Sequence, residues 1–245
     1  MNDDRQKGLV MRRREALLLL SATGATLLAG YSNVLAGSTK SSGGKLPACI
    51  ATPKQTEGPY FVDEHLQRAD IRVDPSDGSV KAGVPLTLGL RISAISSAGC
   101  SPLMGAIVDI WHCDAAGVYS DATDPSFNTL GKKFLRGYQV TNAHGGVQFT
   151  TIYPGWYPGR AVHIHFKVRA KSKSGRHYAF TSQLYFNDAI TDRVYAHQPY
   201  ASRGKRTLRN DGDDIYRDGG RQLMLSLVES GQGYAAMFDV GLRIT

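Results

Sequence analysis

The sequence of 245 residues is poor in cysteine, in long apolar runs and in clustered charge. Its three cysteines, Cys49, Cys100 and Cys113, permit one disulfide and leave one thiol over, and the sequence does not decide which two pair. Their spacing fits no zinc pattern, which argues against a Cys/His zinc site. The apolar run at residues 16–29 is too short to span a bilayer comfortably, so we expect no stable membrane anchor.

Basic clusters and repeats are also missing. The formal net charge is +8, but five of the 29 Lys/Arg and three of the 21 Asp/Glu lie in residues 1–36, which leaves +6 for the rest. This charge is scattered, and no basic helix, zinc finger or aromatic nucleic-acid surface accompanies it, so no nucleic-acid partner is expected. Without an internal repeat or a second core, the chain after the N-terminal segments is predicted to form a single domain.

Residues 1–36 have the features of an export signal. Three arginines at positions 12–14 precede the apolar run, and Val-Leu-Ala at 34–36 predicts cleavage after the alanine. The arginine pair resembles a twin-arginine signal, the route that exports folded proteins, so a periplasmic or extracellular location is expected. Tyr31 stands where a lipoprotein signal needs cysteine, and an uncleaved anchor is the alternative. Residues 37–48 read as a flexible Ser/Gly linker.

Residues 49–245 read as short strands separated by turns. Apolar and polar side chains alternate, or β-favouring residues gather, in residues 85–95, 106–113, 134–140, 147–153, 163–170, 178–186, 222–229 and 234–244. Only residues 189–197 suggest a short helix. We therefore predict an all-β fold, an antiparallel β-sandwich with long active-site loops, and expect hairpins across residues 142–146 and 230–233.

Two histidines in the segment 163–170 are the first candidates for chemistry. His163 and His165 are two residues apart, so in a strand their imidazoles share one face, together with Lys167 and Arg169. The apolar residues between them would fill the opposite face. The alternative is that both are ordinary polar residues on a solvated sheet surface.

The loop before this strand favours a functional site. It contains two Pro-Gly pairs, 154–155 and 158–159, and it carries Tyr157 and Arg160. Pro-Gly turns fix the backbone, and we expect these turns to direct the phenol and the guanidinium toward the histidine strand. A metal ion or an anionic substrate would suit such a pocket.

Tyr119 is a second candidate tyrosine, on a loop just past the predicted strand at 106–113. Taken alone, a tyrosine of this kind is more often a half-buried packing residue. His112 lies nearby, but alternation places it on the apolar face of its strand, so we predict a core histidine with satisfied hydrogen bonds.

Tyr119, Tyr157, His163 and His165 together form a donor set for a hard trivalent cation. A free phenol has a pKa of about 10, and bound Fe(III) would lower it, as metals do for other coordinated acids. The motif contains no carboxylate, which argues against a ferrous site built from two histidines and one carboxylate.

Three motifs resemble the intradiol ring-cleavage dioxygenases, the catechol 1,2- and protocatechuate 3,4-dioxygenase group, and especially its exported single-domain members. They are Q-T-E-G-P-Y-F at 55–61, W-H-C-D-A-A-G-V-Y-S at 111–120 and P-G-W-Y-P-G-R-A-V-H-I-H-F at 154–166. The resemblance implies one non-haem Fe(III) per chain. Tyr119 and His165 would be equatorial ligands, Tyr157 and His163 axial ligands, and hydroxide the fifth. It also implies catalytic roles for Arg160, which matches the family's active-site arginine, and for Gln183, which resembles the glutamine behind the metal ligands.

The resemblance implies an oxidoreductase of aromatic catabolism that takes a small catechol and O2. It would open the ring between the hydroxyls to a cis,cis-muconate-type product, with Tyr157 as a base. The interval between Tyr157 and His163 is shorter than in cytoplasmic relatives, and their N-terminal helical region is missing. The natural catechol and the oligomeric state therefore stay open. The alternatives are a non-catalytic transthyretin-like sandwich that binds small aromatics and a divalent-metal hydrolase.

Overall fold

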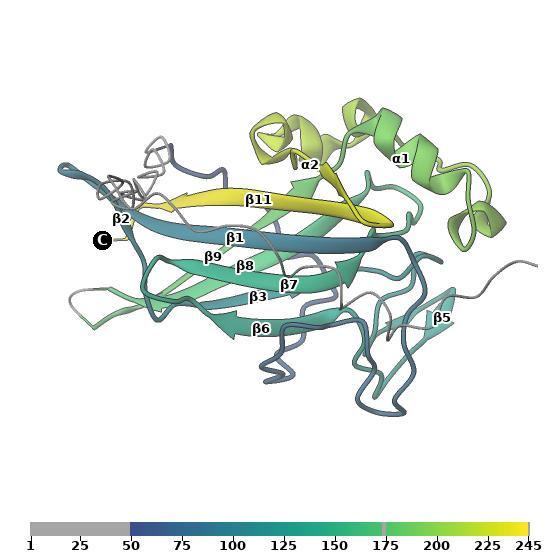
Figure 1. The fold of residues 1–245 in the computed structure, drawn as a ribbon, viewed down its shortest axis with the longest axis horizontal. Helices are drawn as coiled ribbons and strands as arrows, with labels where there is room; N and C mark the ends of the chain where they lie inside the picture. The colour runs from purple at the N-terminus through teal and green to yellow at the C-terminus, as the bar shows by residue number, and fades with distance from the viewer. Residues whose placement is uncertain (1–49, 173–174, 245) are drawn as a thin grey trace, which may run out of the picture. The chain divides into compact units, whose positions relative to one another are not determined.

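Two open β-sheets hold most of the regular structure in this computed structural model, which describes residues 50–172 and 175–244 (Figure 1). The predicted export signal, the linker and Cys49 lie outside the described residues. Cys100 is disulfide-bonded, and Cys113 is a buried free thiol.

The first sheet has the order β10-β11-β1-β2, with β7 also paired to β1, and the second has the order β6-β3-β8-β9. Neighbouring strands in the two sheets are antiparallel, except that β1 and β11 are parallel. The strands are β1 (Pro85–Ser96), β2 (Gly99–Pro102), β3 (Ile107–Trp111), β4 (Thr123–Asp124), β5 (Phe127–Asn128), β6 (Arg136–Val140), β7 (Gly146–Ile152), β8 (His163–Lys171), β9 (His177–Tyr185), β10 (Val228–Ser230) and β11 (Gly233–Leu242). β4 and β5 form a separate small hairpin.

The apolar faces of the two sheets share one core, as the alternation predicts. Leu88 and Leu90 of β1 and Ile164 and Phe166 of β8 are fully buried in the same cluster. Each such side chain contributes about 1.5–3 kcal/mol when it leaves water. Because Ile164 and Phe166 face this core, the alternate residues of β8, His163 and His165, must face the other side of their sheet.

One predicted hairpin is wrong. Residues 142–146 form a tight turn, in which the Asn142 side chain accepts hydrogen bonds from the backbone N–H groups of His144 and Gly146. The strands that the turn joins lie in different sheets, however, because β6 pairs with β3 and β7 pairs with β1. The turn therefore carries the chain across the sandwich. The hairpin across residues 230–233, between β10 and β11, is confirmed.

The predicted strand at 222–229 is also largely wrong. Only β10 at its end is a strand, and the 3-10 helix η3 (Gly220–Leu223) precedes it. Leu223 and Leu225 are buried, which explains the strand-like alternation. The Leu225 N–H bonds to the Tyr185 carbonyl, so this segment packs beside the end of β9 instead of forming a long strand with β11.

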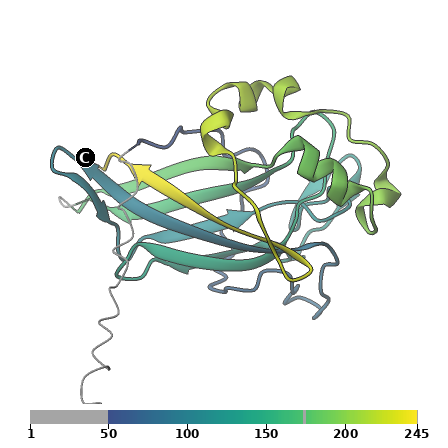
Figure 2. The same cartoon turned by 45° about the horizontal axis from the view of Figure 1, so that its top comes forward.

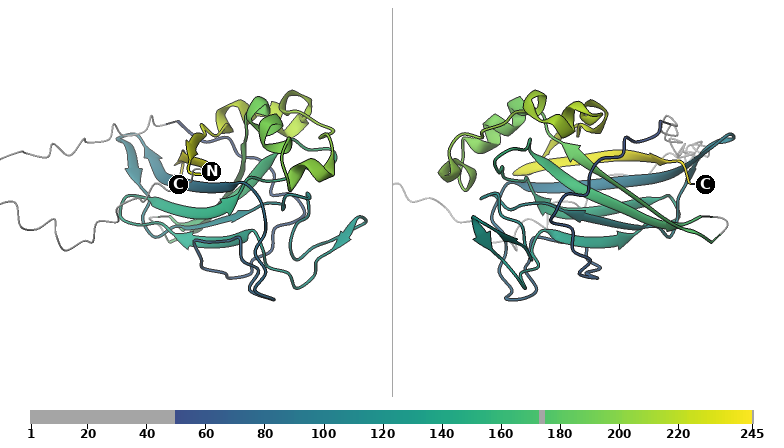
Figure 3. Two further views of the ribbon diagram at one scale, coloured as in Figure 1. Left: turned by 45° about the vertical axis from the view of Figure 1, so that its right-hand side comes forward. Right: turned by 180° about the vertical axis from the view of Figure 1, so that it is seen from behind.

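Short helices gather on one side of the sheets (Figures 2 and 3). The predicted helix is present as α1 (Asp188–Tyr195), which directly follows β9. The sequence did not indicate η1 (Tyr200–Arg203), η2 (Asn210–Gly212) or α2 (Asp214–Arg217). None of the helices in the described part of the chain has the length and apolar character needed to cross a membrane.

Candidate active site

The two histidines of β8 place their imidazole nitrogens against each other at the start of the strand. His163 is 2% exposed and His165 is 1% exposed, so both are buried rather than on a solvated surface. The Nδ1–H of His163 donates to the Ala161 carbonyl at 2.6 Å, which leaves its Nε2 with a free lone pair. This Nε2 lies 3.0 Å from Nε2 of His165. Two ring nitrogens are therefore directed at the same point.

Two loops bring tyrosines to this point. The Tyr157 hydroxyl lies 3.2 Å from Nε2 of His163. The Tyr119 ring is 5.7 Å from the Tyr157 ring and 6.3 Å from the His165 ring, measured between centroids. Tyr119 is 1% exposed, and its hydroxyl has no hydrogen-bond partner. A buried hydroxyl without a partner is costly, so a cation that met this oxygen would be favoured here.

Burial favours the neutral form of all four groups. It raises the pKa of the Tyr119 and Tyr157 phenols well above the usual value. It also lowers the pKa of His163 to about 3 and that of His165 well below the ordinary value. Nearby positive charge, Arg160 included, lowers both histidine pKa values further. Neutral imidazoles are the form that binds metal, and a cation would favour the ionised phenols.

The donor set fits a metal ion. Two imidazole nitrogens and two phenol oxygens converge from β8 and two loops, and one of the oxygens has no partner in the protein. Within residues 50–172 and 175–244, no group of three His, Cys, Asp or Glu side chains could hold a metal ion. A cation at this point would therefore need the tyrosines, and phenolate oxygen favours a hard, highly charged cation.

Arg160 stands beside this cluster in a fixed orientation. Its Nε donates to Oδ2 of Asp213 at 3.0 Å, and its Nη2 donates to Oε1 of Gln183 at 2.5 Å. Gln183 lies opposite His165 in the β8–β9 pair, and its amide nitrogen donates to the Thr56 carbonyl at 3.0 Å. Burial acts to lower the pKa of Arg160, but the nearby Tyr157 and Asp213 raise it overall. The guanidinium is thus a permanent positive charge next to the four donors.

Aromatic rings enclose the cluster. Trp111, at the end of β3, stacks on His165 with 4.9 Å between ring centroids and an angle of 5°. Tyr60 stacks on Tyr119 at 4.4 Å, and its hydroxyl donates to Asp124 at 2.9 Å. Gly58, at a φ of 70°, allows the backbone to approach His165 closely, since a Cβ there would lie 3.3 Å from the imidazole Cε1. These contacts limit rotation of His165 and Tyr119.

The structure brings all six predicted site residues together, although their roles as ligands and catalysts stay predictions. They are Tyr119, Tyr157, His163, His165, Arg160 and Gln183. The sequence did not single out Trp111 or Tyr60, although both stand in the quoted motifs, and nothing local marked Asp213. As predicted, His163 and His165 lie in one strand with Lys167 and Arg169, and alternate residues of that strand, β8, share a face.

His112 is a core histidine with satisfied hydrogen bonds, as predicted. Its Nδ1 donates to the Cys113 carbonyl at 2.8 Å, and its Nε2 accepts from the Thr151 hydroxyl at 2.7 Å. The pair Pro154-Gly155 does not form the expected turn; only Pro158-Gly159 does. Gly155 is needed for space, because a Cβ there would clash with the Asp114 and Ala115 carbonyls.

Comparisons with known proteins find relatives of the chain among dioxygenases. Residues 56–213 match a family model described as "Dioxygenase". The chain is 28% identical to the protocatechuate 3,4-dioxygenase beta chain of Burkholderia cepacia, over 69% of this chain and 71% of the relative. It is also 28% identical to catechol 1,2-dioxygenase of Candida albicans, over 57% of this chain and 49% of the relative. The chain thus spans about half the length of that second relative.

Solved structures agree. An intradiol ring-cleavage dioxygenase from Tetranychus urticae superposes with a TM-score of 0.67 at 28% identity, covering 80% of this chain and 95% of that one. The dioxygenase domain of a carbohydrate-binding fusion protein from Streptomyces sp. SirexAA-E gives 0.56 at 30% identity, covering 80% and 100%. The predicted fold class is confirmed.

Proposed function

Since this chain belongs to the dioxygenase family that its residues 56–213 match, we propose that it cleaves catechol-type rings between their two hydroxyls with O2. The observation that carries the proposal is the convergence of two buried phenols and two buried imidazoles, one phenol without a partner. Family membership supports an enzyme over the non-catalytic transthyretin-like alternative. The reaction adds both atoms of O2 to the ring carbons that carried the hydroxyls, so a catechol becomes a muconic acid and no external reductant is needed.

Tyr119, Tyr157, His163 and His165 would hold one ferric ion. When bound, it would draw electron density from a chelated catechol and make the ring reactive toward O2. The donor set supports this choice, because two phenolates supply hard, negatively charged oxygen ligands that suit a trivalent ion better than zinc.

The chain's own residues would handle protons and charge. A catechol must lose two protons to bind as a dianion. The Tyr157 phenolate is suited to accept one of them because its oxygen lies at the site, and the hydroxide that the family resemblance implies would accept the other and leave as water. Arg160 would stabilise the negative charge that develops on the ring and on oxygen, through N–H groups that Asp213 and Gln183 leave open. Trp111 and Tyr60 would exclude water from one side of the donors.

We also propose that the protein is exported folded, by the twin-arginine route, which would let it acquire iron before it leaves the cytoplasm. The support is the arginine pair and apolar run in residues 1–36. Fractionation of cells that express the full-length chain, compared with a variant whose arginines at 12–14 are lysines, tests this. Retention of only the lysine variant in the cytoplasm is expected, and equal export of both would contradict it.

The activity is tested by oxygen uptake with catechol, protocatechuate and hydroxyquinol supplied separately to the purified protein. We expect one O2 consumed per catechol opened, and isotopically labelled O2 should place both labelled atoms in the product. Ring opening beside the two hydroxyls, or incorporation of only one labelled atom, would refute an intradiol reaction. Tyr157→Phe should lose activity. Tyr178→Phe should keep it, because Tyr178 pairs with Ala170 at the opposite end of β8 from His163.

A further inference from the structure

Asp213 is a buried carboxylate whose two oxygens have different partners. It is 2% exposed and lies at the start of α2. Oδ1 accepts hydrogen bonds from the N–H groups of Ile215 and Tyr216 and so caps the helix. Oδ2 accepts from Nε of Arg160 at 3.0 Å and from the N–H of Ala161 at 2.7 Å. One oxygen therefore belongs to the helix and the other to the site loop.

Asp213 and Gln183 together hold the guanidinium of Arg160 at two of its nitrogens. Arginine has several rotatable bonds, and holding it in one orientation costs conformational entropy. The ion pair with Asp213 fixes Nε, and the bond to Gln183 fixes Nη2. A guanidinium has five N–H donors, so further donors remain for a bound anion. Because burial weakens screening, removing one partner of this pair costs more than it would at the surface.

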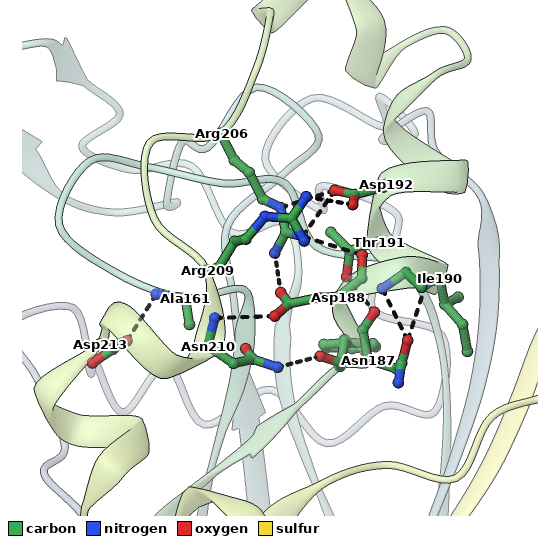
Figure 4. Close-up of polar contacts among 12 residues, drawn as sticks. Ala161, Asn187, Asp188, Ile190, Thr191, Asp192, Arg206, Arg209, Asn210 and Asp213 are labelled. Atoms are coloured by element: carbon green, nitrogen blue, oxygen red, sulfur yellow. Dashed lines mark hydrogen bonds and ion pairs between the residues drawn. The ribbon is translucent and has the colours of Figure 1, made fainter.

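The chain places Asp213 firmly. Figure 4 shows the segment before it tied to α1 and to the end of β9. Arg206, 5% exposed in its side chain, pairs with Asp188 and, at 2.8 Å, with Asp192. The Asn210 amide donates to the Phe186 carbonyl at 2.8 Å. These contacts hold the segment next to the strand that carries Gln183, so both partners of Arg160 rest on the same support.

We propose that Asp213 is a positioning residue for Arg160: its Oδ2 orients the guanidinium so that the remaining N–H donors meet the charge that develops on the substrate. This inference rests on the proposed ring cleavage. A purely structural role, as the cap of α2, would use Oδ1 alone, and the effect of an Asp213 substitution on turnover would then be the same with or without Arg160.

The test compares Asp213→Asn with the parent enzyme. An amide can offer its oxygen to the helix or to Arg160 and Ala161, but not to both. With the oxygen on the helix, the NH2 group faces the Arg160 and Ala161 donors and cannot accept from them. With the oxygen on Arg160, the ion pair is replaced by a weaker hydrogen bond to a neutral acceptor. We expect kcat with catechol to fall about 10- to 100-fold, the range for losing one charged hydrogen bond in a site. KM should change less. Iron content and the visible spectrum of the resting protein should stay as in the parent.

A double-mutant cycle separates positioning from stability. In an Arg160→Ala background, Asp213→Asn should change kcat by less than about twofold, because the residue it acts through is gone. Asp213→Ser can still cap α2 but cannot reach Arg160, so its kcat should fall as far as that of Asp213→Asn. It replaces Asp213→Asn in the test if that variant folds poorly. Asp214→Asn removes an exposed charge next door and should leave kcat unchanged.

Three results would overturn the proposal. The first is a kcat of Asp213→Asn equal to that of the parent, and the second is a double variant in which the two losses of kcat multiply. The third is loss of iron from Asp213→Asn, because that would mean that Asp213 acts on the metal donors and not through Arg160. A parent protein that cleaves no catechol would instead refute the proposed function itself. The two failures are therefore distinguishable.

Discussion

His112 allows a prediction about acid stability that can be worked out in numbers. It is completely buried, and burial lowers the pKa of its imidazole to about 4 from the ordinary 6.5. The neutral ring fits the site, because Nδ1 donates to the Cys113 carbonyl and Nε2 accepts from Thr151. The unfolded chain therefore binds a proton more readily than the folded chain between these two pH values. Stability that is fully present above pH 6.5 is lost as the pH falls toward 4.

The size follows from the pKa difference. At pH 5 the histidine is protonated in the unfolded chain and neutral in the folded chain. Since pH 5 lies 1.5 units below the unfolded pKa of 6.5, the folded state has lost about 2 kcal/mol of stability, at about 1.36 kcal/mol per unit. Loss would reach about 3.4 kcal/mol below pH 4, on the same scale. Asn at position 112 can keep the bond to the Cys113 carbonyl but does not titrate.

Denaturant unfolding of the parent and His112→Asn at pH 7.5 and pH 5, with excess chelator present, measures the effect. The parent should lose about 2 kcal/mol more than the variant between the two pH values. A cost of the substitution that does not depend on pH, such as the unpaired Thr151 hydroxyl, cancels because each protein is compared with itself at the two pH values. The titration of groups that both proteins contain cancels when the two changes in unfolding free energy are subtracted. Equal losses would refute the description of His112 as a neutral buried residue.

Other substitutions test the packing and the donors. Tyr119→Phe removes the hydroxyl without a partner, so the metal-free protein should gain about 1 kcal/mol in denaturant unfolding, while metal analysis should find little iron; full iron content would contradict the assignment. Gly58→Ala, at a φ of 70° and against His165, should cost about 1–2 kcal/mol and lower iron occupancy, and an unchanged melting curve would argue against this close approach. Gly117→Ala would place a Cβ against the Trp156 carbonyl oxygen at a φ of 79°, so thermal unfolding should show a loss of at least about 1–2 kcal/mol.

The donors could be found from sequence because local periodicity determines where they point. His163 and His165 alternate with Ile164 and Phe166, and burial of the apolar pair leaves the histidines on the other face of β8. Tyr157 lies close in sequence and reaches the same point. Tyr119 lies far away in sequence, and no local periodicity placed it beside the histidines; it was a candidate only because it stands on a loop just past a predicted strand.

The errors have a common physical cause, which is that local patterns do not specify partners. The turn at 142–146 is correctly formed, yet β6 and β7 belong to different sheets because their pairing depends on β3 and β1. Asp213 meets Arg160 only after a long segment folds back over α1, and no spacing in the sequence announces that contact.

Metal analysis and a visible spectrum of the purified protein test the central claim most directly. If Tyr119, Tyr157, His163 and His165 hold one ferric ion, the protein should contain about one iron per chain and show a strong phenolate-to-iron absorption band. The band should be altered in Tyr157→Phe and retained in Tyr178→Phe. A colourless protein, or one that contains zinc in place of iron, would contradict the claim.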